Sequence, residues 1–160
     1  MAFVDEDSEN ATVNARFYNV TKAVGYGCPN EKEDAMMVQF FLKRIYMHKE
    51  MKPLAPKGNM TVDGKVGPVT RNWILKFQLD MRNGGHACLA DGVMDKAGNP
   101  ENGDNYVASM SHTKYAIRLL NNGLRQLDSV LYKTLPVNPE VPAELRAAFV
   151  QMNAATPLGL

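Results

Sequence analysis

The hydrophobic pattern near the start of the chain predicts a helix that is apolar on most of its surface. Apolar residues between Asn30 and about Met47 cover well over half of a helical circumference, so this helix is expected to lie centrally in a core or to be covered on two sides. Asn30 is expected to be its N-cap, and Glu33, three residues later, completes a capping box. The helix is expected to end before Pro53.

A second helix is predicted from Pro68 to about Arg82. Pro68 suits the first turn of a helix because its missing N–H would have no partner there. The run Asn83-Gly84-Gly85 ends the helical pattern. The loop between the first two helices is expected to contain a short strand at residues 60–62.

A third, long helix shows the most regular apolar stripe in the chain. It is expected to begin at Asp104 or Asn105 and to reach Leu131, because apolar residues recur at spacings of three, four and seven. Glycine costs about 1 kcal/mol of helix stability relative to alanine, so a bend or break is expected close to Gly123. A short final helix is expected to open at Pro142.

The two ends of the chain differ from this helical middle. Residues 1–27 start with acidic residues and then alternate apolar and polar positions, which predicts an extended arm with a short strand between residues 12 and 20. Residues 132–160 contain a proline-rich spacer, which favours an extended tail that carries the final helix. The predicted architecture is therefore mainly α, with a three-helix domain at residues 28–131 between an arm and a tail.

Composition and charge exclude several classes of protein. The chain has 160 residues, of which 45% are hydrophobic and 22% charged, as is typical of a globular domain. The net charge of +1 argues against a nucleic-acid binder that relies on clustered basic residues. No apolar run approaches the roughly 20 residues that span a bilayer, so no membrane partner is expected.

Reactive side chains offer little for catalysis or metal binding. The histidines His48, His86 and His112 form no zinc-binding pair. The best constellation is Cys28 with His86 and Cys88, because antiparallel helices would bring the two cysteines to the same end. A disulfide between Cys28 and Cys88 and a pair of free thiols are both open. We expect no enzyme activity, no cofactor and no metal.

One motif narrows the choice among three-helix domains. A turn with a glycine suited to positive φ precedes the second helix, and a Phe-Gln pair lies seven residues after a threonine in the first helical turn. Gln39 and Gln78 are expected to hydrogen-bond loop backbone from within the helices. Asp63 and Thr70 are expected to be turn and cap residues in preference to ligand contacts. The motif positions with structural roles are Asp63, Gly64, Gly67, Pro68, Thr70, Phe77, Gln78, Asp91 and Gly92.

This pattern resembles the signature of the peptidoglycan-binding-like domain family. That signature is a D-G-x-x-G-P-x-T turn followed by an F-Q pair, with L-Q-x-x-L in the first helix and a second D-G loop downstream. The first-helix pattern appears here as Val38-Gln39 with Leu42, and the second loop as Ala90-Asp91-Gly92-Val93. The resemblance covers about residues 28–127 and implies a three-helix fold that binds cell-wall glycan or stem peptide without catalysis.

Two departures from the family pattern lie around the expected glycan groove. Trp73 stands where a small residue is usual, and Asp95 with residues 96–105 separates the second loop from the last helix. A neutral sugar polymer needs an aromatic platform and a few amide partners. The preferred interpretation of Trp73 is nevertheless a core residue of the second helix. The candidate binding residues are Trp73, Asn72, Tyr26, Tyr106 and Asn105.

These observations predict a non-catalytic module that binds peptidoglycan or another cell-wall glycan and belongs to a larger assembly. The alternative is a purely structural subunit of a phage virion or phage-like injection particle, with the fold used for protein–protein contacts. Residues 1–27 and 132–160 are expected to contact protein neighbours, which predicts an oligomeric or particle-associated chain. The N-terminus lacks the pattern of a Sec signal, which predicts a virion-like particle protein or one made in the cytoplasm and released to the wall.

Overall fold

Helices dominate the structure. The computed structural model describes residues 4–6, 16–97 and 114–155, and the chain is mainly helical, as predicted. The helices are α1 (Lys32–Met47), the 3-10 turn η2 (Lys52–Leu54), α2 (Pro68–Asn83), α3 (Ala116–Leu127), α4 (Ser129–Lys133) and α5 (Ala143–Ala155). Two antiparallel strand pairs complete the described part: β1 (Val4–Glu6) with β2 (Arg16–Tyr18), and β3 (Val24–Gly25) with β4 (Val93–Met94).

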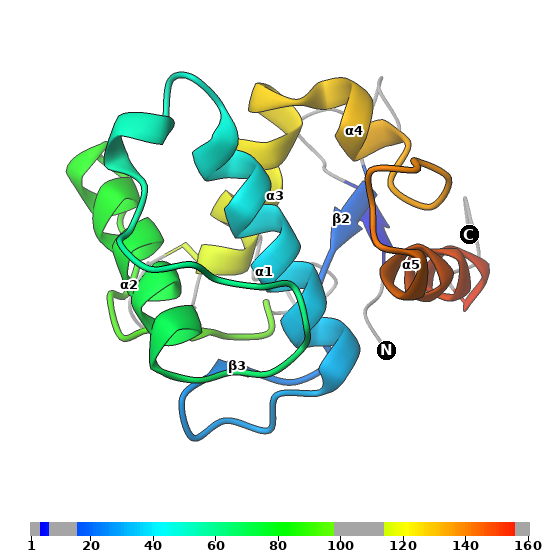
Figure 1. Cartoon of the computed structure of the whole chain (residues 1–160), viewed down its shortest axis with the longest axis horizontal. Helices are drawn as coiled ribbons and strands as arrows, with labels where there is room; N and C mark the ends of the chain where they lie inside the picture. Colours follow the sequence, from blue (N-terminus) through cyan, green and yellow to red (C-terminus); the bar gives the residue numbers. More distant parts are fainter. Residues whose placement is uncertain (1–3, 7–15, 98–113, 156–160) are drawn as a thin grey trace.

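Helix α1 lies at the centre of the molecule. It is flanked by α2 on one side and by β2 and α5 on the other, and it also packs against α3 (Figure 1). Every residue from Asp34 to Leu42 is buried, so this stretch has no stripe that faces solvent. The expectation of a helix covered on more than one side is confirmed.

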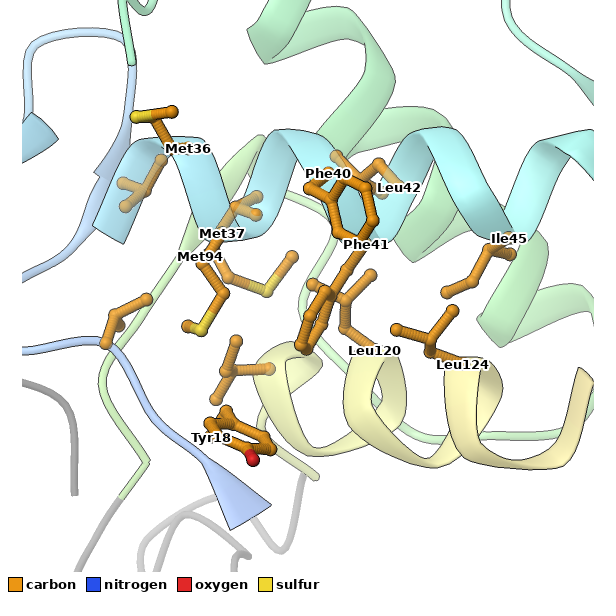
Figure 2. Close-up of a cluster of buried hydrophobic side chains, with 14 of the residues drawn as sticks. Tyr18, Met36, Met37, Phe40, Phe41, Leu42, Ile45, Met94, Leu120 and Leu124 are labelled. Carbon is orange, nitrogen blue, oxygen red and sulfur yellow. The ribbon is translucent and has the colours of Figure 1, made fainter. Parts of the chain in front are cut away.

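Helices α1 and α3 approach each other closely. Figure 2 shows Phe41 and Ile45 of α1 facing Leu120 and Leu124 of α3, and all four side chains are at most 1% exposed. A Cβ atom at Gly123 would lie 3.3 Å from Ile45 Cδ1, so the glycine leaves room for the neighbouring helix. Helix α3 continues through this position, so the helix has no break there.

Segments from both ends of the chain join the same core. The ring centroid of Tyr18 in β2 lies 5.0 Å from that of Phe149 in α5 and 5.7 Å from that of Tyr132 in α4. Phe41 of α1 stacks on Phe149 at 6.2 Å. Such aromatic pairs add stability beyond the area that they bury. The core therefore crosses the boundaries predicted at residues 27 and 132.

Buried carboxamides tie β2 and the residue after it to the core. Asn121 Oδ1 accepts hydrogen bonds from the Tyr18 N–H at 2.9 Å and from the Tyr132 hydroxyl at 2.8 Å, while its Nδ2 donates to the Tyr18 carbonyl at 2.9 Å. Asn19 forms a two-way pair with the backbone of Ala97, at 3.0 and 3.1 Å. Because both side chains are at most 2% exposed, these paired groups specify one arrangement of the segment.

The start of α1 differs from the prediction. Asn30 has a φ of +51°, and its carboxamide pairs with the N–H and C=O of Gly25, both at 2.8 Å. Helix α1 consequently begins at Lys32, with Glu31 at the N-cap position. Asparagine is favoured both at N-caps and in the left-handed region. The bonds to Gly25 select the second role, and the predicted capping box of Asn30 with Glu33 is wrong.

The third helix is shorter than predicted at both ends. Tyr115 has an extended backbone, so α3 begins at Ala116 and does not continue from position 104 or 105; residues 98–113 lie outside the described part. After Leu127 the helix stops at Asp128, whose carboxylate accepts a hydrogen bond from the Leu131 N–H at 3.1 Å and caps α4. The side chain of Asp128 therefore caps a new helix, α4, where the sequence pattern predicted that the third helix would continue.

The predictions for the other elements have mixed outcomes. Helix α2 begins at Pro68, as predicted, and α5 follows Pro142, also as predicted. Strand β2 confirms a short strand between residues 12 and 20. Residues 60–62 form no strand. Met60 there is 2% exposed and fills the core, so its apolar character reflects burial in a loop.

Candidate functional site

A glutamine from α1 holds the first Asp-Gly turn. Gln39 Oε1 accepts hydrogen bonds from the N–H groups of Asp63 at 3.1 Å and Gly64 at 2.9 Å. Its Nε2 donates to the Lys65 carbonyl at 2.9 Å and to Thr70 Oγ1 at 3.1 Å. Gln39 is 1% exposed, so this turn satisfies a carboxamide that has no access to water. The predicted bonding of loop backbone by Gln39 is confirmed.

A glutamine from α2 holds the second Asp-Gly turn in the same way. Gln78 Oε1 accepts from the Gly92 N–H at 2.8 Å, and its Nε2 donates to the Val93 carbonyl at 2.8 Å and to Asp91 Oδ1 at 3.2 Å. In both turns the aspartate accepts from the N–H two residues later, at 2.9 Å for Asp63 and 3.0 Å for Asp91. The described chain thus contains one local unit twice, a helix glutamine that holds an Asp-Gly turn.

The glycines let these turns lie directly on the helices. Gly64 has a φ of +77° and Gly92 a φ of +75°. A Cβ atom at Gly64 would lie 2.6 Å from Lys32 Cγ and 2.9 Å from the Lys32 carbonyl oxygen, and one at Gly92 would lie 3.1 Å from Arg71 Cγ. Lys32 and Arg71 each stand seven residues before the helix glutamine. The repetition therefore extends to the helix positions that the turns contact.

The remaining motif residues start α2 and anchor it in the core. Gly67 occupies the N-cap and Pro68 the first helical position. Thr70 is 4% exposed and Phe77 is fully buried. The hydroxyl of Thr70 accepts the bond from Gln39 Nε2, so Thr70 links the start of α2 to α1.

Two of the candidate binding residues are exposed near the second turn. Tyr26 is 67% exposed and follows β3, which pairs with β4 directly after the turn. Asn72 is exposed on α2, next to Arg71, whose side chain lies against Gly92. Asn105 and Tyr106 lie outside the described residues. The structure thus places Tyr26 and Asn72 on elements that meet around one turn.

Trp73 lies in the core, which the sequence interpretation preferred. It is 7% exposed, and its ring packs edge-on against Tyr46 of α1 with centroids 5.8 Å apart. A ring this buried offers no open face for a sugar to stack on. Within the described part of the chain, the indole Nε1 is buried and has no hydrogen-bond partner.

The sequence interpretation missed a polar cluster beside Trp73. The Tyr46 hydroxyl donates to Asp80 Oδ2 at 2.6 Å, and Lys76 Nζ lies 2.5 Å from Asp80 Oδ1. Burial, and then the bond to Asp80, raise the pKa of Tyr46 far above its ordinary value. The spacing of four residues between Lys76 and Asp80 was a visible helix-pair signal, but the bond to Tyr46 required the packing of α1 on α2.

The two cysteines are free thiols, Cys28 half-buried and Cys88 buried. The disulfide alternative is therefore wrong, and the alternative of two free thiols holds. Burial raises the pKa of the Cys28 thiol, and the carboxylates of Asp95 and Asp91 raise it further. Burial also raises the pKa of Cys88. Both thiols are protonated at neutral pH, which makes them poor nucleophiles.

Alkylation of the native chain is expected to be slow at neutral pH and to accelerate with a midpoint above the ordinary cysteine value of about 8.5. The raised pKa also means that the unfolded chain releases these protons more easily, so folding stability falls as pH rises above that value. Mass spectrometry of iodoacetamide labelling across a pH series checks the rate, with Cys28→Ser to assign the sites and the urea-unfolded chain as reference. A native midpoint at or below that of the unfolded chain would contradict the assignment.

Metal chemistry and membrane insertion find no support in the described residues. No group of three His, Cys, Asp or Glu side chains gathers there to hold a metal ion. None of the helices described is both long and apolar enough to cross a bilayer. No family model matches this chain, and no curated protein or solved structure matches it significantly.

Proposed function

We propose that this chain is a non-catalytic module that binds peptidoglycan or a related cell-wall glycan and works as part of a larger assembly. The observation that carries the proposal is the repeated unit in which Gln39 and Gln78 hold the two Asp-Gly turns. These are the positions at which the sequence resembles the peptidoglycan-binding-like family. The proposal therefore rests on the turn chemistry and on the exposed side chains beside it.

The surface around the second turn has the chemistry that a sugar polymer needs. Tyr26 offers an aromatic ring that is 67% exposed, Asn72 offers an exposed carboxamide, and Asp91 offers an exposed carboxylate. Aromatic stacking and a few hydrogen bonds are the usual means of holding a neutral ligand. Trp73 is left out of this surface because it is buried.

Co-sedimentation with purified sacculi tests this proposal. Tyr26→Ala is expected to lower the affinity for sacculi about fivefold, because it removes a stacking contact of roughly 1 kcal/mol. Tyr26→Phe keeps the ring and should retain binding. Asn72→Ala is expected to weaken binding by a similar factor through loss of a hydrogen bond of about 1 kcal/mol. Asn59→Ala, at an exposed loop position, serves as the control for loss of a surface carboxamide.

Two results would overturn wall binding. One is wild-type protein that stays in the supernatant at every sacculus concentration. The other is sedimentation that Tyr26→Ala, Asn72→Ala and Asn59→Ala leave equally unchanged. Thermal unfolding by circular dichroism verifies that each variant is folded.

The alternative is a purely structural subunit of a phage virion or phage-like injection particle, and exposed apolar side chains favour it. Val130 in α4 and Val137 after it are each 72% exposed, and Met47 at the end of α1 is 62% exposed. Such side chains are typical of contacts with other proteins when they gather on one face. A stable high-order assembly that does not sediment with sacculi would support this alternative over wall binding.

A further inference from the structure

Lysines and apolar side chains are exposed together at the C-terminal end of α1 and in the loop that follows it. Lys49, Lys52 and Lys57 are exposed, Met47 is 62% exposed and Leu54 is 45% exposed. We refer to these five residues as the basic loop surface. The whole chain has a net charge of only +1, whereas residues 47–57, with three lysines and the exposed Glu50, carry 3 − 1 = +2, so positive charge is concentrated locally.

The backbone of this loop is ordered by its own hydrogen bonds. The N–H groups of Met51 and Lys52 both donate to the His48 carbonyl, at 2.9 and 2.8 Å, and the Leu54 N–H donates to the Met51 carbonyl at 2.9 Å. Met51 also packs against the core. The basic loop surface is therefore a formed surface, not a free chain.

The charges of this surface are available to a partner. The ion pairs among the described residues use other lysines, namely Lys22, Lys32 and Lys76. No ion pair in that part of the chain includes Lys49, Lys52 or Lys57. A partner that fits must supply carboxylates for the lysines and apolar side chains for Met47 and Leu54.

We propose that the basic loop surface binds residues 3–9 of a second copy of this chain. That segment reads Phe3-Val4-Asp5-Glu6-Asp7-Ser8-Glu9, two apolar residues followed by four acids. It combines the two chemistries that a partner of the basic loop surface must supply. A phosphate-rich polymer would pair with the lysines but would leave Met47 and Leu54 in water.

The fold separates the two complementary surfaces within one copy. Strand β1 includes residues 4–6 and pairs with β2, and Figure 1 shows β2 on the side of α1 that faces α5, away from the loop after α1. Within the described residues β1 has one strand partner only, so its other edge is paired with no described strand. Contact between different surfaces on two copies is head-to-tail, so it extends to a ring or a filament.

The inference elaborates the assembly half of the proposed function and rests on it, but it does not need wall binding. Sedimentation velocity without wall material measures it directly, at about 50 mM and about 300 mM salt. The full chain is expected to associate at low salt and to dissociate at high salt. The triple variant K49E/K52E/K57E is expected to weaken association at least about tenfold, because exposed charge pairs are individually weak but add up.

A control variant and a charge swap make the test specific. K65E/R82E/K133E changes exposed basic residues elsewhere by the same total charge and is expected to associate like wild type. D5K/E6K/D7K should be monomeric alone, and its mixture with K49E/K52E/K57E should associate again, because each variant then meets an opposite charge.

Several outcomes would overturn the inference. The first is a wild-type chain that is monomeric at low salt. The second is equal association of K49E/K52E/K57E and the control K65E/R82E/K133E. The third is a mixture of D5K/E6K/D7K with K49E/K52E/K57E that stays monomeric. Binding of the chain to anionic lipid vesicles without self-association would assign the surface to a membrane instead. Loss of sacculus binding with association intact would contradict wall binding alone.

Discussion

Phe149→Ala is expected to lower the free energy of unfolding by about 4 kcal/mol, because it removes a fully buried ring and leaves a cavity. Phe149 is 0% exposed, and its ring contacts those of Tyr18 and Phe41 from two other elements. The C-terminal segment should therefore unfold together with α1 in one transition. Urea denaturation followed by far-ultraviolet circular dichroism measures the change.

The neighbouring residue provides the control for this substitution. Val150 on the same helix is 51% exposed, so Val150→Ala should change stability by less than about 0.5 kcal/mol. If Phe149→Ala leaves the midpoint of the main transition unchanged, α5 is a dispensable tail, and the boundary predicted at residue 132 is the better description of the chain.

Gly64→Ala is expected to lower the free energy of unfolding by about 3 kcal/mol. Two effects contribute, the positive φ and the close packing, and the same substitution at Gly27 separates them. A positive φ costs a residue with a Cβ atom roughly 1–2 kcal/mol, and overpacking against fixed atoms adds roughly 1–3 kcal/mol. At Gly64 both apply, because the new Cβ would lie 2.9 Å from the Lys32 carbonyl oxygen. At Gly27 φ is also positive, at +79°, but nothing lies within 4 Å.

The expected order of destabilisation is Gly27→Ala, then Gly92→Ala, then Gly64→Ala. Gly92 is intermediate because its new Cβ would meet the side chain of Arg71, which can move, at 3.1 Å. Thermal melts of the three variants measure the order. Equal losses of stability in Gly27→Ala and Gly64→Ala would show that the positive φ alone explains the need for glycine at position 64. Close packing of the turn against α1 would then contribute nothing.

The helices could be predicted where one signal dominated. Helix α2 has a proline at its first position and glycines after its end. These residues favour the start and the end of a helix through their own backbone geometry, independently of what packs around them. The Asp-Gly turns were equally local, since glycine is the residue that tolerates their backbone angles. The two glutamines were identified because a buried carboxamide inside an apolar helix needs backbone partners.

The predictions failed where a residue can serve two roles and a specific contact in the folded chain selects one of them. Asn30 serves a left-handed turn because its side chain pairs with Gly25. Gly123 remains inside a helix because Ile45 occupies the space where its side chain would be. Asp128 interrupts the third helix because its carboxylate caps the next one and also lies 3.1 Å from Arg44 Nη2. Ile45 and Arg44 lie far away in the sequence. Gly25 and Leu131 are close in the sequence, but the local pattern allowed either role for Asn30 and Asp128.

The sequence by itself determined the helical class and the places of α1, α2 and α5, because these depend on neighbours a few residues away or on burial alone. The motif also indicated the two glutamine-held turns, although each glutamine bonds a turn that lies further along the chain, with separations of 26 and 14 residues for Gln39–Lys65 and Gln78–Gly92. Only the tertiary structure decided that β2 and α5 share one aromatic core with α1, and that Trp73 is buried while Tyr26 is exposed. The physical reason is that burial and aromatic contact depend on which segments meet in space. An apolar residue looks the same in the sequence whether a core, a partner or solvent surrounds it.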